Sequence, residues 1–213
     1  MRIGQSTGTR ARLVEAARDL FWSRGYEATS LGDVVRASKV NPGSLYYFFR
    51  TKESLLLAVL DWYTTALYPV LIEPLLQPPG DPIERVFALL GGYRRGLEES
   101  RCMRGCPIGN LALEVGDSQP RARSRIARNF AGWREWVQKF LDEAVTAGDL
   151  PSGTDTASLA SFVLASMEGA VMQARAHRSL APFDQVVAQL RNYFDLLRAP
   201  RTAGRKNEKR RTR

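Results

Sequence analysis

The fold is decided by residues 29–55, which read TSLGDVVRASKVNPGSLYYFFRTKESL. The Thr-Ser pair at the start can cap a helix over 31–37, because a hydroxyl oxygen there accepts a hydrogen bond from a free backbone N–H. After a three-residue link, Asn41 can cap a second helix with Pro42 at its first position, where no N–H is needed. The stretch therefore predicts two short helices joined tightly, with a longer helix after them.

Two short helices in this arrangement are typical of a helix-turn-helix, in which the second helix enters the major groove of DNA and the first braces it. The apolar residues have the spacing of a shared core: Val34, Val35, Val40, Leu45 and Phe49. A plain helical hairpin would show the same periodicity. The outer face of the second helix favours DNA, because Tyr46 and Tyr47 lie among cations, with no acidic residue nearby to repel phosphates.

Outside this stretch the chain also has the periodicity of helices and no alternating pattern of a strand. We expect further helices from Thr9 to Gly25, Thr51 to Leu67, Asp81 to about Arg101, Cys106 to about Gly116, Pro120 to Gly148, Thr156 to about His177 and Pro182 to Leu197. The predicted fold class is all-α.

The chain has 213 residues and a net charge of +9, which is concentrated at its two ends. Residues 1–55 hold nine basic and five acidic side chains, residues 56–198 hold 15 and 16, and residues 199–213 hold seven and one. Cationic segments on a neutral body fit a module that binds a polyanion, although basic tails also occur without a partner. The final segment lacks large apolar side chains, which predicts a disordered basic tail over 201–213.

The residue inventory argues against most other classes of protein. Two cysteines and His177 cannot supply the four ligands of a structural zinc site, and no nucleophile motif accompanies the histidine. We therefore predict no enzyme, no metal and no cofactor. No apolar run approaches the roughly 18 residues of a membrane span, and the N-terminus is polar and basic, so we expect a cytoplasmic protein without a membrane partner.

The run from Gly43 to Tyr46, with Phe49 and the pair Lys52-Glu53 at fixed spacing after it, resembles the TetR family of bacterial transcriptional regulators. The resemblance covers about a quarter of the chain. It implies a two-fold dimer that represses transcription, binding double-stranded operator DNA with one domain and a small-molecule inducer with the other. A constitutive or architectural DNA-binding protein without inducer is the alternative. The domains implied are a helix-turn-helix DNA-binding domain over 1–51, a helical ligand-binding and dimerisation domain over 52–200, and the tail over 201–213.

The resemblance also implies which side chains contact DNA. Phosphate contacts fall on Tyr46, Tyr47 and Lys52, with Thr29 or Ser30 at the start of the preceding helix, and base-edge contacts fall on Asn41, Pro42, Gly43 and Ser44. One departure from the family lies in the turn, where Lys39 replaces the usual glycine. A residue with a Cβ must either adopt a positive φ there or relax the turn.

The run from Arg104 to Glu114 resembles a subgroup of the family that responds to reactive electrophiles, such as quinones and aldehydes, through a cysteine in this region. Cys106 would begin a helix, whose dipole favours the thiolate, and Arg101 and Arg104 would lower the thiol pKa further. We therefore consider Cys106 a possible redox sensor. The alternative is a small buried residue at a helix start.

The expected ligand pocket collects large or polar side chains from several helices, each of which could instead belong to the core. Its candidates are Tyr63, Phe87, Cys106, Asn110, Trp133, Met167 and Met172.

The last two helices are the expected dimer interface, because one has small residues that allow close approach and the other has an apolar stripe. The residues are Ala160, Ser161, Ala165, Gly169 and Ala170 on the first helix, and Phe183, Val187, Leu190, Phe194 and Leu197 on the second.

Overall fold

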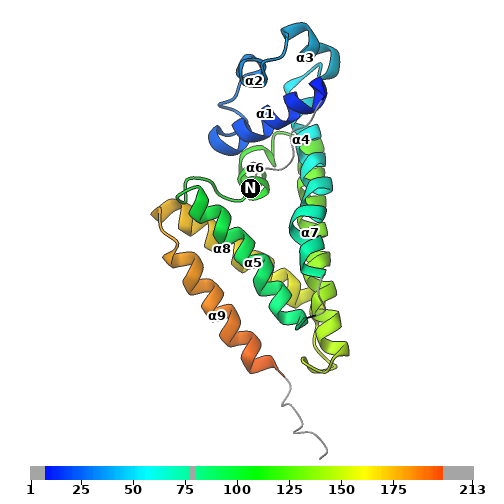
Figure 1. Cartoon of the computed structure of the whole chain (residues 1–213), viewed down its shortest axis with the longest axis vertical. Helices are drawn as coiled ribbons and strands as arrows, with labels where there is room; N and C mark the ends of the chain where they lie inside the picture. The colour runs from blue at the N-terminus through cyan, green and yellow to red at the C-terminus, as the bar shows by residue number, and fades with distance from the viewer. Residues whose placement is uncertain (1–7, 77–79, 199–213) are drawn as a thin grey trace, which may run out of the picture.

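The structure is a computed structural model that describes residues 8–76 and 80–198, and the regular structure in these ranges is entirely helical (Figure 1). The helices are α1 (Thr9–Arg24), α2 (Leu31–Ser38), α3 (Pro42–Phe48), α4 (Lys52–Leu67), α5 (Pro82–Glu99), α6 (Pro107–Val115), α7 (Pro120–Thr146), α8 (Thr156–His177) and α9 (Ala181–Leu197). A π-helical turn (Tyr68–Ile72) and a 3-10 turn (Glu73–Leu76) follow α4. The all-α prediction is confirmed, while the predicted tail lies outside the described residues.

Local sequence explains why the first short helices begin where they do. The Ser30 hydroxyl accepts the backbone N–H of Asp33, and the Asp33 carboxylate accepts the backbone N–H of Ser30, which is a complete capping box. The Asn41 side chain accepts the backbone N–H of Gly43, and Pro42 stands at the first helical position. The caps of α2 and α3 were therefore readable from the chain.

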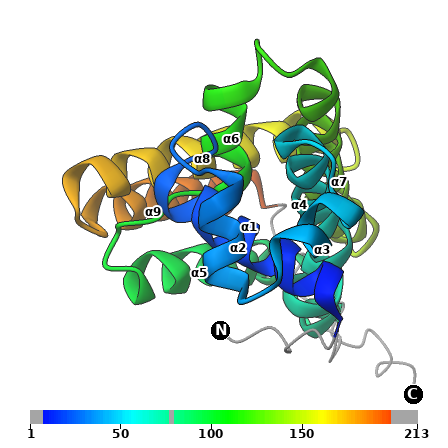
Figure 2. The ribbon, with the colours of Figure 1, turned by 90° about the horizontal axis from the view of Figure 1, so that it is seen from above.

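The first three helices lie at one end of the molecule, and α4 and α7 run side by side away from them (Figure 1). Seen from above, α1, α2 and α3 lie over the larger helical body (Figure 2). The core of this end contains Leu13, Val34, Leu45 and Phe49, all buried. The same hydrophobic cluster continues along α4 into the body, so the two parts of the molecule share one core.

Helix α4 joins the two parts. Leu55 and Leu56 at its start and Leu60 in its middle are fully buried. Two polar contacts tie it to α7, since Arg125 pairs with Asp61 at 2.8 Å and the Asn129 amide donates to the Leu60 carbonyl at 3.2 Å. The predicted boundary at residue 51 remains a prediction, because α4 packs against both parts.

Two helical stretches, 52–76 and Thr156–His177, are long and apolar enough in composition to cross a membrane. Both contribute to the core of the fold. Helix α4 packs against α1 and α7, and α8 packs against α7 and α9. Core helices of a folded domain have this composition when they are covered on several sides.

Five of the ten residues predicted for the dimer interface are buried within one chain, so they are wrong for a contact with a second chain. Phe183, Leu190 and Phe194 of α9 are buried within one chain, as are Ala160 and Ala170 of α8. The apolar stripe read from the sequence of α9 is the face that packs on the body, because an amphipathic helix turns its strongest stripe toward its own core first.

Candidate DNA-binding face and candidate ligand cluster

Helix α3 presents nearly all of its side chains to solvent. Among its residues only Leu45 is buried, whereas Tyr46 is 59% exposed and Tyr47 is 81% exposed. The Tyr47 ring packs edge-on against Phe48, with the ring centroids 4.9 Å apart. Two exposed phenols and an uncharged helix start form a face that can approach a phosphate backbone without repulsion.

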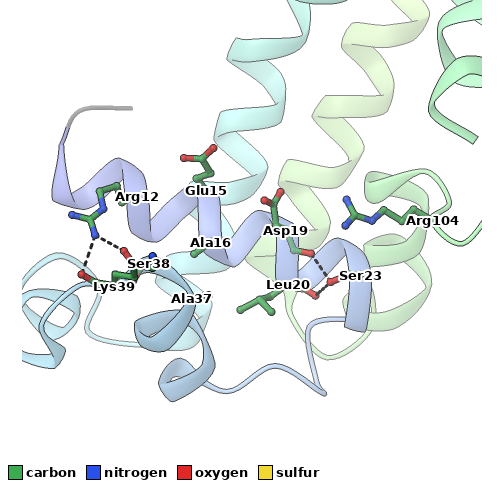
Figure 3. A pocket seen from close by; sticks show the side chains of 10 residues that line it. All are labelled: Arg12, Glu15, Ala16, Asp19, Leu20, Ser23, Ala37, Ser38, Lys39 and Arg104. Carbon is green, nitrogen blue, oxygen red and sulfur yellow. Dashed lines mark hydrogen bonds between the residues drawn. The ribbon is translucent and has the colours of Figure 1, made fainter. Parts of the chain in front are cut away.

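The turn before α3 is held in a left-handed conformation. Lys39 has φ 54° and ψ 38°, so the chain takes the first of the two expected alternatives. From α1, the Arg12 guanidinium donates to the carbonyl oxygens of Ser38 at 2.6 Å and Lys39 at 2.9 Å (Figure 3). These bonds satisfy carbonyls that the end of α2 leaves without helical partners.

A groove of about 510 Å³ runs along α1 beside this turn (Figure 3). Its lining carries both signs of charge, with Glu15 and Asp19 on α1 and Lys39 at the turn. Arg104 enters from the loop before α6 and points toward Asp19 (Figure 3). The groove therefore lies where the DNA-binding unit meets the segment that leads into α6.

The hydroxyls at the start of α2 differ in availability. Thr29 is 1% exposed and donates to the Gly25 carbonyl at 2.7 Å, so its side chain is committed to the interior. The prediction that Thr29 contacts phosphate is wrong for this arrangement. Ser30 is exposed, but its hydroxyl donates to the Asp33 carboxylate at 2.6 Å as part of the cap. Sequence alone could not show which of these two adjacent hydroxyls is buried.

Lys52 begins α4 and is held by the turn between α1 and α2. Its ammonium lies 4.1 Å from the centre of the Tyr26 ring and 3.4 Å from the Glu27 carbonyl oxygen. A cation over an aromatic face keeps its charge while losing freedom of movement. Lys52 is therefore a pre-positioned cation beside α3.

In the body, three helices bring polar groups together around the start of α6. Cys106 caps α6, and its sulfur accepts the Gly109 backbone N–H at 3.4 Å. A Cβ on Gly109 would collide with the Glu168 carboxylate of α8 and lie 3.5 Å from the Cys106 side chain. The Glu168 carboxylate and Tyr93 of α5 are both close enough to the Cys106 thiol to interact with it electrostatically. We call Tyr93, Cys106 and Glu168 the polar cluster; Cys106 is buried, and the other two are partly buried.

Burial opposes ionisation of each group in the polar cluster. Burial raises the pKa of the Cys106 thiol well above its usual value, and the nearby Glu168 carboxylate raises it further. Burial also raises the pKa of Glu168 and of Tyr93. The predicted lowering of the Cys106 pKa is wrong, because desolvation outweighs the helix dipole. Arg104, one of the two arginines expected to lower this pKa, lies over the Trp22 ring, with its guanidinium carbon 4.7 Å from the ring centre.

The other predicted pocket residues fall into different surroundings. Tyr63 of α4 is buried, and Cys106 contributes to raising its pKa, after burial as the main cause. The Trp133 ring packs edge-on to Tyr93 at 6.3 Å. The Asn110 amide oxygen accepts a hydrogen bond from Arg175 at 2.9 Å. Tyr63 and Trp133 therefore lie beside the polar cluster, whereas Asn110 pairs with α8.

The three remaining candidates for the ligand pocket lie in other surroundings. Met167 is a buried core residue of α8. Phe87 packs edge-on to Phe194 of α9 at 5.6 Å. Met172 is 58% exposed, so its inclusion in an enclosed pocket of one chain is wrong.

Sequence reasoning missed the side chains that join the two parts of the molecule. The Trp22 indole donates to the Gly105 carbonyl at 2.7 Å, and the Glu114 carboxylate accepts two backbone N–H groups of the turn after α1. These partners are 83 to 88 residues apart in the chain. No local pattern in one sequence marks such pairs.

An exposed recognition helix braced by α2, on top of a larger helical body, defines a DNA-binding transcriptional regulator. Residues 13–59 match the family model described as bacterial regulatory proteins, tetR family. Residues 82–190 match the model described as the tetracyclin repressor-like C-terminal domain. The chain belongs to the TetR family.

Similar proteins align along most of the chain. The HTH-type transcriptional repressor DhaR of Mycobacterium sp. (strain GP1) is 29% identical over 179 residues, which are 84% of this chain and 88% of that protein. An HTH-type transcriptional regulator of Mycobacterium tuberculosis (strain CDC 1551 / Oshkosh) is 33% identical over 187 residues, covering 87% of this chain and 93% of that protein. The crystal structure of Escherichia coli NemR in its reduced form has a TM-score of 0.77 at 26% identity, covering 90% of this chain and 98% of that chain.

Proposed function

We propose that this repressor leaves its operator when a reactive electrophile adds to Cys106. The observation that carries the proposal is that the Glu168 carboxylate and the Cys106 side chain lie together against Gly109, at the first turn of α6. Helix α6 also contacts α1, so a change at its start can reach the DNA-binding unit. The similarity to NemR, whose structure is described as a reduced form, supports a redox-related signal. We infer that the protein acts in the cytoplasm, where bacterial DNA lies.

The proposed chemistry needs a base, because the thiol is protonated at rest. As the sulfur of Cys106 attacks an electron-poor ring carbon of a quinone, an S–C bond forms and the thiol proton passes to Glu168. The proton then reaches one quinone oxygen, and the hydrogen on the attacked ring carbon moves as a proton to the other oxygen. The ring becomes a hydroquinone thioether without a further reductant. The raised pKa of Glu168 makes it a better proton acceptor than an ordinary carboxylate.

The added ring would act on the structure through its volume. Cys106 is 6% exposed and Gly109 leaves no room for even a Cβ beside Glu168. A closely packed site cannot accept a six-membered ring without moving its neighbours. We therefore expect the adduct to displace the start of α6.

The test measures binding to a DNA fragment from upstream of the protein's own coding sequence, before and after treatment with 1,4-benzoquinone. The unmodified protein should bind, and the quinone should weaken binding while a mass shift appears on the peptide that contains Cys106. Cys106→Ala should remain bound, and the matched control Cys102→Ala, which removes the other buried cysteine, should still respond. Binding that persists on the fully modified protein would support a constitutive DNA-binding protein instead.

We propose that α3 and the start of α4 form the DNA contact, with Tyr46, Tyr47 and Lys52 on phosphates and Ser44 on a base edge. Asn41, Pro42, Gly43 and Ser30 are exposed as well, and we propose that they contribute to the same contact. Lys52→Ala and Tyr46→Phe should weaken binding to operator and random DNA together, since phosphate contacts carry no sequence information. Ser44→Ala should act mainly on the operator. The salt slope should fall by about 1 in Lys52→Ala.

We propose that two chains associate through the outer faces of α8 and α9. Phe162, Met172, Tyr193 and Leu196 are all exposed there, and the Phe162 and Tyr193 rings contact at 5.6 Å. A Cβ on Gly169 would meet nothing within 4 Å, so a second helix has room to approach. Exposed apolar side chains on two adjacent helices fit a four-helix contact between copies.

Leu196→Glu tests the interface, because Leu196 is 85% exposed and a charge there costs nothing to the single chain. The variant should be a monomer of about 24 kDa by light scattering. Leu113→Glu is the control, since Leu113 is 83% exposed on α6, away from this face. Dimers in both variants would place the interface elsewhere.

A further inference from the structure

The side chain of Glu114 crosses from the body to the DNA-binding unit. It lies near the end of α6, and its two carboxylate oxygens accept different backbone N–H groups in the turn after α1. One bond comes from Tyr26 at 2.8 Å and the other from Glu27 at 2.9 Å. A carboxylate that accepts two N–H groups fixes the turn more firmly than either bond alone.

The turn is shaped to admit this carboxylate. Gly25 ends α1 with φ 94°, a conformation that other residues rarely adopt. A Cβ at this position would also lie 2.8 Å from one oxygen of Glu114 and 3.1 Å from the other. Glycine is therefore required here both by its backbone and by the approach of a side chain from α6.

The same two turn residues hold Lys52. The Tyr26 ring lies 4.1 Å below the ammonium of Lys52, and the Glu27 carbonyl oxygen is 3.4 Å from it. The backbone N–H groups of these residues therefore face Glu114, while their ring and carbonyl face the lysine. A shift of the turn would move the surface against which Lys52 rests.

We infer that Glu114 is a positioning residue for DNA binding, which holds the turn at Tyr26 and Glu27 and so places the Lys52 ammonium for a phosphate of the operator. The acidic side chain of Glu114 is unsuited to binding a phosphate, so we assign it no direct contact with DNA. Its contribution passes through the turn to Lys52. The inference requires only that the protein binds DNA, and it is independent of the chemistry at Cys106.

The direction of the effect separates positioning from simple electrostatics. If Glu114 acted only through its charge, removing it would strengthen binding to a polyanion. If it positions Lys52, removing it should weaken binding, because the lysine then spends part of the time away from the phosphate. The two roles predict opposite signs for one substitution.

The experiment is a double-mutant cycle on binding to a random 30-base-pair duplex, measured by fluorescence anisotropy at several salt concentrations. Glu114→Ala should weaken binding by about three- to tenfold and lower the salt slope by up to about 1, as expected for one impaired phosphate contact. In a Lys52→Met background the same substitution should have no weakening effect. Glu114→Gln keeps one acceptor oxygen and should weaken binding less than Glu114→Ala.

Two further measurements fix the interpretation. Amide hydrogen exchange at Tyr26 and Glu27 should accelerate in Glu114→Ala, with helicity unchanged by circular dichroism. The control is Asp117→Ala, which removes a carboxylate from the loop after α6 and leaves the bonds to the turn in place. Tighter binding by Glu114→Ala, or equal weakening with and without Lys52, would overturn the inference. Failure of the unmodified protein to bind any duplex would instead contradict its function as a DNA-binding regulator.

Discussion

Helices α3 and α6 begin in the same way but lie in opposite surroundings. Each begins at the proline of an X-Pro pair, and the residue before the proline caps the helix, with φ −63° at both Asn41 and Cys106. Each cap accepts a nearby backbone N–H, from Gly43 in α3 and from Gly109 in α6. Proline fixes the preceding residue in an extended conformation and suits the first helical position. The two helix starts therefore share one local cause.

Their surroundings give them different chemistry. Helix α3 buries Leu45 alone, so its cap and its tyrosines stay accessible to DNA. Helix α6 buries Ile108 and Leu111, and its cap faces Glu168. Desolvation then raises the pKa of the capping thiol. The comparison shows that local sequence decides where a helix begins, whereas the packing around it decides what its first residue can do.

The sharpest test compares alanine at the two glycines. Helix propensity favours both substitutions by up to about 1 kcal/mol. At Gly43 the new Cβ would lie 3.3 Å from the Asn41 side chain, but at Gly109 it would collide with the Glu168 carboxylate. We expect the free energy of unfolding of Gly109→Ala to fall below that of Gly43→Ala by about 1–3 kcal/mol, the cost of overpacking. Urea unfolding of both variants measures it, and equal values would show that Glu168 moves aside freely.

The same contrast explains how far the sequence could be read. Caps, prolines and apolar periodicity are local, so the helices and the exposed face of α3 were predicted. The raised pKa of Cys106 was not predicted, because it depends on burial and on Glu168, which lies 62 residues further along the chain. The prediction that Thr29 contacts phosphate was wrong for a related reason, since the burial of Thr29 follows from the path of the turn at Gly25. Contacts between distant segments left no pattern in one sequence.

The dimer face shows a second limit. Periodicity on α9 finds Phe183, Leu190 and Phe194 because they are strongly apolar, and these residues pack within the chain. The exposed residues of the same helix, Tyr193 and Leu196, form a weaker stripe. A helix with two apolar faces needs the fold to show which face is already covered.

The second test of this comparison concerns the raised pKa of Glu168 and its effect on stability. Burial raises its pKa above the ordinary value of 4.5, so the folded protein binds this proton more tightly than the unfolded chain. The free energy of unfolding should therefore fall as pH rises from about 4.5 through the folded pKa. Glu168→Gln stays neutral and lacks this fall, so its stability relative to the unmodified protein should increase with pH over that window.

Urea unfolding between about pH 2 and pH 8 measures this difference and covers the window of the control. The control is Asp155→Asn at the start of α8, because hydrogen bonds from Ser158 lower the pKa of Asp155 below 3.8. A lowered pKa gives stability that is present above 3.8 and lost as pH falls, which is the opposite sign in a more acidic window. Parallel curves for Glu168→Gln and the unmodified protein would show that the cluster does not depress ionisation.

The smallest expected effect concerns the turns that lead into the two helices. Both contain left-handed residues other than glycine, with φ 54° at Lys39 before α3 and φ 55° at Cys102 before α6. Lys39 is exposed, whereas Cys102 is 3% exposed and packs in the core. Glycine at either position removes the steric cost of a Cβ, but only at Cys102 would it also leave a cavity.

Lys39→Gly should therefore raise the free energy of unfolding by about 0.5–1 kcal/mol, the left-handed strain relieved less the added flexibility of the unfolded chain. Lys39→Ala keeps the Cβ and removes the same charge, so it should leave stability nearly unchanged. The bonds from Arg12 reach the Ser38 and Lys39 carbonyls and survive both substitutions. Because both variants lose one cation, they should weaken binding to random DNA equally, and any difference in stability between them reports the backbone alone. Equal stability of Lys39→Gly and Lys39→Ala in thermal unfolding would show that the left-handed conformation of Lys39 has no steric cost.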